Sequence, residues 1–186
     1  MRQLPLPDKK PRPESDAVDD YRKDRDLAQY DVLYFLECLG KDRNTHYSDC
    51  GRPDVENRHE PRPDRLAIDD ITGRHLVVEY TELRIAEEMP RMRHDLERFG
   101  FTVPPVLGGE ELAKKLTEAI AQKREKNQFV QYPSAEKVML LRDWVSSAHR
   151  RREFDQCSQY FKPPGNPGCD HCYILLRKNG GIIELF

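Results

Sequence analysis

Apolar residues recur every three or four positions in several segments, and this spacing predicts helices. The segment from Asp19 to Leu39 has this spacing and is followed by Gly40, which favours a helix that stops there. The segment Glu110–Lys126 carries a clear apolar face and predicts another helix. Residues 84–99 have the same spacing in two pieces, the second beginning at Pro90, so they predict two short helices.

Segments rich in β-forming residues lie between and after these helices. Residues 65–69 and 74–83 flank the turn Asp-Ile-Thr-Gly and predict a hairpin. Residues 137–141 predict a short strand, and residues 173–177 and 182–186 flank the turn Lys-Asn-Gly-Gly and predict a second hairpin. The order of these elements predicts an α/β (α+β) fold with a mixed β-sheet flanked by helices.

Three polar stretches lack such patterns. Residues 1–18 contain four prolines and many charges, so they predict a disordered N-terminal arm, while residues 19–186 predict one domain. Residues 41–63 predict a long loop, which in a compact domain is often functional. Residues 145–170 predict irregular structure with a short helix around 154–160.

Composition narrows the class of protein. The 186 residues are 37% hydrophobic and 34% charged, and the net charge of −2 excludes a globally basic nucleic-acid coat, although a local basic patch stays open. No apolar run reaches the ~18 residues of a membrane helix and the N-terminus lacks the apolar part of a secretory signal, so no membrane association is expected. Five unevenly spaced cysteines favour free thiols in a reducing cytoplasm over a disulfide framework.

The first predicted hairpin brings two carboxylates together. A turn centred between positions 71 and 72 puts Asp64 directly opposite Glu79. Opposed side chains share one face of a sheet with Cβ atoms about 4.5–5.5 Å apart, so the two like charges should raise a pKa. A magnesium ion would resolve this repulsion, because Mg²⁺ prefers carboxylate, water and phosphate oxygens. Spacing alone leaves an alternative open, in which Asp64 caps the chain after Pro63 and Glu79 pairs with an arginine.

The residues of this hairpin resemble the motif of the PD-(D/E)XK nuclease superfamily, which includes the restriction-endonuclease-like enzymes. Pro63-Asp64 stands before one strand and Glu79-Tyr80-Thr81 ends the next, within an expected αβββαβ core. The resemblance implies a restriction-endonuclease-like fold and Mg²⁺-dependent hydrolysis of phosphodiester bonds in nucleic acid, with DNA as the favoured substrate. It makes Asp64 and Glu79 the metal ligands, the main-chain carbonyl of Tyr80 a third ligand, and Glu37 on the first helix a candidate further acid.

The chain departs from the family motif at the lysine. Thr81 stands where the motif has lysine, whose task is to position the attacking water and stabilise negative charge; threonine can hydrogen-bond a water but supplies no charge. Some members carry the lysine on the following helix, which makes Lys123 the first candidate and Lys126 the second. Lys123 continues the apolar face of its helix, so it either points into the site or extends past the core into solvent. No strand is evident before Asp64, a second departure from the motif.

Two other features carry candidate chemistry. The run His149-Arg150-Arg151-Arg152 would contact phosphates in a nucleic-acid-binding protein, although short basic runs are commonly solvated surface. Cys169-x-x-Cys172, with Cys157 earlier in the same stretch, is half of a zinc site, but no second pair accompanies it and zinc is not expected.

These features together predict a cytoplasmic, magnesium-dependent nuclease with Asp64, Glu79, Thr81 and Lys123 in its catalytic site. The alternative is the same fold kept as a catalytically inactive binding or assembly module. A homodimer is compatible with the sequence, which does not fix the oligomeric state. The two functions differ in one distance, because an active enzyme needs the Lys123 ammonium group within hydrogen-bond or one-water reach of Glu79.

Overall fold

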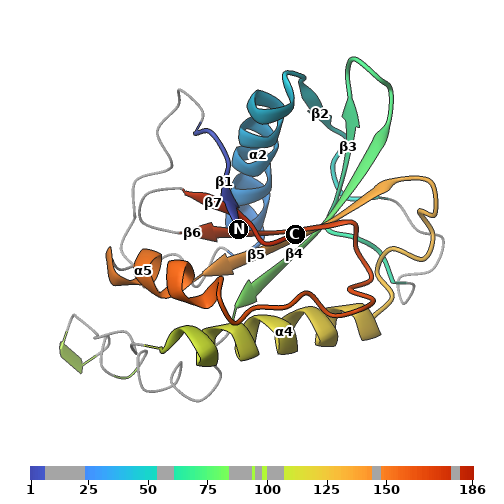
Figure 1. The fold of residues 1–186 in the computed structure, drawn as a ribbon. Coiled ribbons are helices and arrows are strands. Elements are labelled where there is room, and N and C mark those ends of the chain that lie inside the picture. Colours follow the sequence, from blue (N-terminus) through green and yellow to red (C-terminus); the bar gives the residue numbers. More distant parts are fainter. Residues whose placement is uncertain are drawn as a thin grey trace.

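The computed structural model describes residues 1–6, 24–53, 61–83, 94, 98–99, 107–143, 148–176 and 181–186. In these residues, a seven-stranded mixed sheet lies between helices on its two faces (Figure 1). The helices are α2 (Asp24–Arg43), α4 (Gly109–Glu125) and α5 (Ala148–Cys157). The strands are β1 (Arg2–Gln3), β2 (Tyr47–Asp49), β3 (Arg65–Asp69), β4 (His75–Leu83), β5 (Glu136–Asp143), β6 (His171–Leu176) and β7 (Ile182–Glu184).

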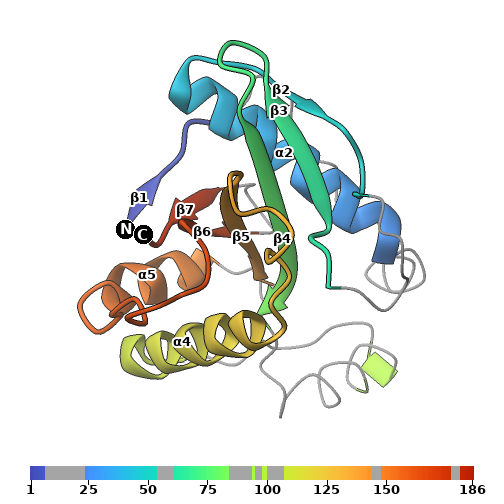
Figure 2. The same ribbon diagram turned by 90° about the vertical axis from the view of Figure 1, so that its right-hand side faces the viewer.

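The elements form three layers. Helix α2 covers one face of the sheet, and α4 and α5 cover the other (Figure 2). Because side chains of a strand alternate between faces, Leu76 and Val78 of β4 join the core beneath α2, while Val77 joins the core beneath α4. Glu79 and Thr81 continue the row of Val77, so both lie on the α4 face of the sheet.

The strand order across the sheet is β1-β7-β6-β5-β4-β3-β2. The three central strands β4, β5 and β6 are parallel to one another, and the outer pairs are antiparallel. Helix α4 forms the crossover between the parallel neighbours β4 and β5, since such neighbours cannot be joined by a tight turn. The helix predicted over 110–126, the strand over 137–141 and both hairpins are confirmed.

The β3–β4 hairpin has the register that its turn predicts. Leu66 pairs with Val77, and Gly73 closes the turn with a φ of +68°, which glycine adopts at no steric cost. Continuing this register brings Asp64, which immediately precedes β3, across from Glu79. The hairpin therefore carries both predicted metal ligands at the end away from its turn.

Two elements lie where the sequence predicts irregular structure. Strand β2 falls within 41–63, a stretch predicted as a loop, and pairs with β3. Only Tyr47 of its three residues is buried, which leaves too little alternation to detect. Helix α5 begins at Ala148 rather than near residue 154, and the sequence did not reveal this start because the first half of the helix is strongly basic.

Helix α2 continues past its predicted stop. Gly40 lies inside the helix, which ends at Arg43. A Cβ atom at Gly40 would lie 2.7 Å from the carbonyl oxygen of Thr45, so a side chain there would clash with the chain that leaves the helix. The glycine therefore permits close approach of the following segment rather than ending the helix.

The N-terminal residues also differ from the prediction. Residues 1–6 are packed rather than disordered, because Arg2 and Gln3 pair with β7 and the side chain of Leu4 is 1% exposed. The amino-acid composition of residues 1–18 does not reveal the packing of residues 1–6, because this packing involves only a short edge strand and one buried leucine. Residues 7–18, and most of the helices predicted over 84–99, lie outside the described residues.

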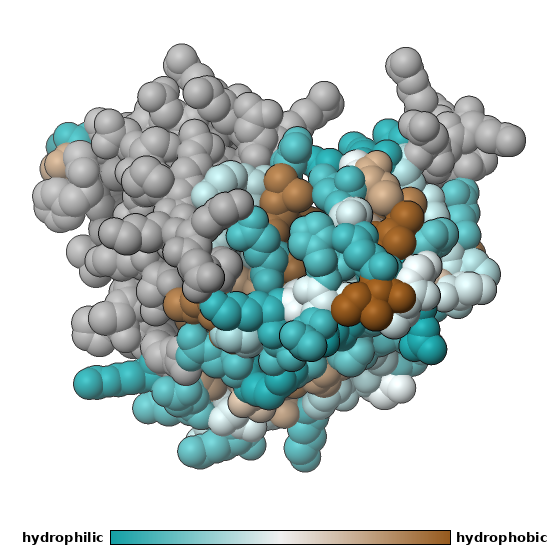
Figure 3. Space-filling view, turned by 90° about the horizontal axis from the view of Figure 1, so that it is seen from above, coloured by the Kyte–Doolittle hydropathy of each residue, from teal (hydrophilic) through white to brown (hydrophobic). Residues whose placement is uncertain are grey.

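The face of the molecule seen from above is mainly hydrophilic where it is described (Figure 3). In this view, its hydrophobic side chains are scattered in small groups among polar ones. Among the described helices, none is both long enough and apolar enough to cross a membrane.

Candidate active site

The four residues predicted to form the catalytic site line one cavity of about 790 Å³. Asp64 enters it from the start of β3, and Glu79 and Thr81 from β4. Lys123 comes from the last turn of α4, on the same face of the sheet. Residues far apart in the sequence thus converge because the β3–β4 hairpin and the α4 crossover meet at this point.

Glu79 is the most buried member of this group, with 3% of its surface exposed. Its Oε1 atom accepts a hydrogen bond from Lys123 Nζ at 2.5 Å, while Oε2 has no hydrogen-bond partner among the described residues. Burial raises the pKa of Glu79 to about 7, the charge of Asp64 adds to the rise, and Lys123 opposes it. The carboxylate therefore has a free oxygen at a position where negative charge is costly.

Lys123 points into the site rather than into solvent. Its helix buries Leu116 and Ile120 on the face that meets the sheet, and Lys123 continues that face with a side chain only 16% exposed. Its Nζ lies 2.5 Å from Glu79 Oε1 and 3.5 Å from the main-chain oxygen of Tyr80. Its ammonium group thus contacts two of the three groups that the family resemblance makes metal ligands.

Asp64 is tied to the strand that carries Glu79. Its Oδ2 accepts a hydrogen bond from the Tyr80 main-chain N–H at 3.0 Å, and its Oδ1 lies 3.7 Å from Arg52 Nη2. Asp64 thus stabilises β4 through Oδ2 and lines the cavity, with Arg52 near its other carboxylate oxygen.

The side chain of Tyr80 lies on the opposite face of the sheet and is hydrogen-bonded there. Its hydroxyl donates to Asp31 Oδ2 at 2.8 Å and accepts from Arg142 Nη1 at 3.3 Å, and Arg142 lies 2.9 Å from the same Asp31 oxygen. Burial and Asp31 raise the pKa of Tyr80, so the hydroxyl stays a donor. Sequence reasoning missed this cluster, although a lone arginine after the apolar run of β5 was an available signal.

Other predicted residues lie elsewhere. Glu37 is exposed and lines a different cavity, near β2, because it lies on the outer side of α2. Lys126, the second candidate lysine, is exposed and lines the first cavity. The basic run His149–Arg152 forms the start of α5, where Arg152 is exposed and the other three side chains lie outside the description. Its contact with nucleic acid stays a prediction.

The three cysteines of the C-terminal part are buried free thiols. Burial raises the pKa of Cys157 to about 11 and that of Cys169 to about 12, and it raises the pKa of Cys172 as well. In the described part of the chain, no three His, Cys, Asp or Glu side chains gather as a group that could hold a metal ion. These thiols therefore act as small apolar core side chains.

The donor set at Asp64 and Glu79 fits Mg²⁺. Two carboxylates and a main-chain carbonyl are hard oxygen ligands, and Mg²⁺ commonly completes its coordination with water and substrate oxygens. The unpartnered Oε2 of Glu79 is the atom that such an ion would satisfy.

Comparison with known proteins supplies no relative for this chain. No protein family model matches it, and no curated protein or solved structure is significantly similar to it.

Proposed function

We propose that this protein is a magnesium-dependent nuclease with a divergent restriction-endonuclease-like fold. The observation that carries the proposal is the convergence of Lys123, from α4, on a buried Glu79 that stands across from Asp64. The order α2-β2-β3-β4-α4-β5 supports the fold, since it follows the αβββαβ order of the family. Strand β2, which pairs with β3, would correspond to the core strand that the family motif has before Asp64.

The chemistry follows from the groups that line the cavity. A Mg²⁺ ion held by Asp64 and Glu79 would polarise a phosphodiester and lower the pKa of a coordinated water. Lys123 would donate to that water or to a phosphoryl oxygen, the role of the motif lysine. Thr81 lies on the same face of β4 and would orient the water through its hydroxyl.

The proposed substrate is nucleic acid, with DNA favoured by the family resemblance. Lys115 and Lys126 line the same cavity and would contact phosphates beside the cleaved bond. The run His149–Arg152 would add contacts further along the substrate.

A non-catalytic binding module is the second candidate. The hydrogen bond between Lys123 and Glu79 favours it, because an ammonium group already compensates one carboxylate without a metal ion. The two candidates differ in Mg²⁺ binding, which only the nuclease requires.

The test is cleavage of supercoiled plasmid, linear duplex and single-stranded DNA with and without Mg²⁺. We expect Glu79→Gln to lower cleavage on the order of 10²–10³-fold, and the control Glu125→Gln, an exposed position at the end of α4, to cleave like wild type. Calorimetric titration with Mg²⁺ should detect binding to wild type and not to Glu79→Gln. Wild-type protein that neither cuts nor binds Mg²⁺ would leave only the binding module.

A further inference from the structure

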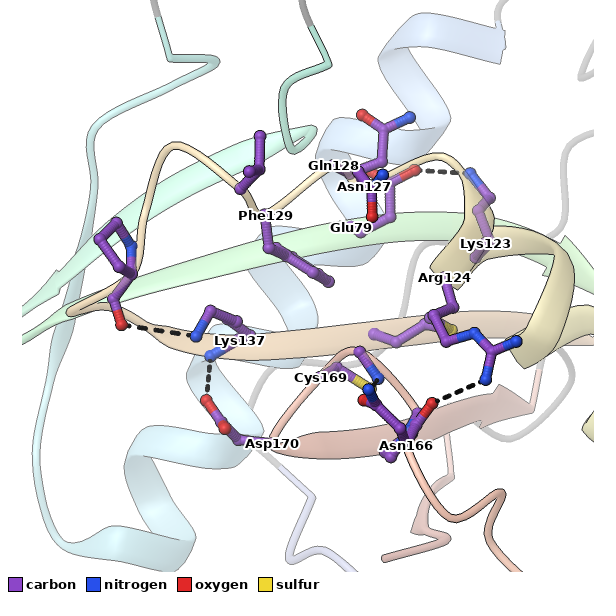
Figure 4. Close-up of a pocket in the computed structure, with 15 residues that line it drawn as sticks. Glu79, Lys123, Arg124, Asn127, Gln128, Phe129, Lys137, Asn166, Cys169 and Asp170 are labelled. Carbon is purple, nitrogen blue, oxygen red and sulfur yellow. Dashed lines mark hydrogen bonds and ion pairs between the residues drawn. The ribbon is translucent and has the colours of Figure 1, made fainter.

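A second cavity lies on the other side of the Glu79–Lys123 pair. It has a volume of about 480 Å³, within the range of about 300–1,000 Å³ typical of small-molecule pockets. The two cavities share Glu79, Lys123 and Gln128, so they adjoin at the proposed catalytic centre. Figure 4 shows the second cavity over β5, between the segment that follows α4 and the segment that precedes β6.

The walls of this cavity are fixed by specific contacts. Arg124 Nη1 donates to the main-chain oxygen of Asn166 at 3.2 Å, and its side chain packs so closely on Gly168 that a Cβ there would lie 2.9 Å from Arg124 Cγ. The main-chain N–H of Lys137 donates to Asp170 Oδ2 at 2.8 Å. The segment before β6 is thereby attached both to α4 and to β5, and the cavity exists without a ligand.

The floor of the cavity is apolar. Phe129, Met139 and Cys169 line it, and each is less than a tenth exposed. A flat aromatic or heterocyclic ring would bury against such a floor, since aromatic and thioether side chains favour ring contacts.

The rim offers mainly hydrogen-bond donors. The cations of Arg124 and Lys137 lie at opposite ends of the cavity (Figure 4). Lys137 Nζ donates to the main-chain oxygen of Pro133 at 3.5 Å, and the carboxylates of Glu79 and Asp170 also line the cavity. Gln128 Oε1 accepts from the Arg62 main-chain N–H and Asn166 Oδ1 from that of Gly168, so these bonds use the acceptor ends of both amides. Amide NH₂ groups and cations favour a ligand rich in acceptors, such as a phosphate or the edge of a nucleobase.

We propose that this cavity binds one unpaired nucleotide of the substrate, with its phosphate at Arg124, its base on the Phe129–Met139 floor and the acceptor edge of the base toward Lys137. The inference rests on the proposed function and narrows its substrate. A base inside a duplex stays stacked and enters a concave pocket only after leaving the stack. The favoured substrate is therefore nucleic acid with a single-stranded or frayed nucleotide next to the cleaved bond.

Binding can be tested apart from cleavage. The wild-type chain is titrated with dTMP, deoxyribose 5-phosphate and inorganic phosphate in EDTA, followed by NMR or calorimetry. We expect dTMP to bind most tightly, and Lys137→Met to weaken it about tenfold through loss of a charged contact. The control Lys114→Met, at a position 76% exposed on α4, should bind like wild type. Equal binding of all three probes, or no binding of dTMP, overturns the inference.

Cleavage then separates the two proposals. Wild type should cut DNA with a single-stranded overhang at least tenfold faster than blunt duplex, and Lys137→Met should reduce this ratio. Equal cutting of both substrates by wild type and Lys137→Met overturns the nucleotide pocket and leaves the nuclease intact. Tight binding of dTMP by a protein that never cuts supports the pocket and overturns the nuclease.

Discussion

Strand β4 has an ionic cluster on each face, and the two clusters differ in how their carboxylates are compensated. On the α2 face, Arg142 pairs with buried Asp31, and the charge of Glu82 also acts on Arg142. On the α4 face, Lys123 pairs with Glu79 and Arg52 lies 3.7 Å from the partly exposed Asp64, but the buried Glu79 Oε2 has no donor among the described residues. An ion pair of the first kind holds a fold together, whereas a buried carboxylate oxygen without a donor is an atom that a bound cation would satisfy.

Breaking the α2-face cluster should have the largest effect on stability. Arg142→Met removes the guanidinium group that lies 2.9 Å from the buried Asp31 carboxylate, and we expect a loss of about 3–5 kcal/mol in the free energy of unfolding. Urea denaturation measures it. The control Arg152→Met removes an exposed arginine and should change stability by less than about 0.5 kcal/mol. A similar small change for Arg142→Met would contradict a structural role for this cluster.

Breaking the α4-face pair should affect activity more than stability. If the proposed nuclease mechanism holds, Lys123→Met is expected to lower cleavage on the order of 10²–10³-fold, because it would remove the charge assigned to stabilising the transition state. Its stability loss should be smaller than that of Arg142→Met, since Glu79 has a pKa of about 7 and can take up a proton instead. Cleavage assays and denaturation measure both quantities, with Lys114→Met as control. Unchanged cleavage would remove Lys123 from the mechanism.

The raised pKa of Glu79 predicts a pH dependence that distinguishes the two faces. The folded protein holds a proton that the unfolded chain releases, so without metal its stability should fall as pH rises from 4.5 to about 7. A pKa shift of this size corresponds to roughly 3 kcal/mol. Glu79→Gln should lose this component of the pH dependence, as measured by denaturation across the range. Above pH 7, Mg²⁺ should stabilise wild type but not this variant, and equal stabilisation of both would contradict a metal site at Glu79.

The smallest effect on stability and cleavage is expected from Tyr80, whose hydroxyl belongs to the α2-face cluster and whose main chain contacts Asp64 and Lys123. Tyr80→Phe removes the hydroxyl that bonds to Asp31 but leaves the Asp31–Arg142 pair, so stability should fall by about 1 kcal/mol. Cleavage should fall only slightly, because the main-chain groups of Tyr80 that contact Asp64 and Lys123 are retained. A loss of cleavage comparable to that of Lys123→Met would mean that this cluster positions the active site.

The sequence predicted the local part of this site well. A four-residue turn fixes hairpin register, so the juxtaposition of Asp64 and Glu79 followed from counting residues. Lys123 could be predicted as a site residue because it continues the apolar face of a regular helix. Both signals lie within single supersecondary units.

The non-local part was not predictable in the same way. Asp31 and Arg142 meet only because α2 packs across the parallel β4–β5 pair, and no spacing along the chain encodes that contact. Glu37 was predicted as the acid of the first helix, yet it lies on the exposed side of α2. The second cavity forms where the segment after α4 and the segment before β6 meet across β5, so the sequence alone did not predict it.

The crossover through α4 also gives the site an order of assembly. Glu79 precedes Lys123 by 44 positions, so a ribosome makes the acidic hairpin before the lysine that compensates it. A hairpin closes through local contacts, whereas the parallel pairing of β4 with β5 requires the whole intervening segment and is slower. During synthesis the two acids are therefore brought side by side before Lys123 can compensate the charge of Glu79, and the pair is complete only when β5 has joined the sheet.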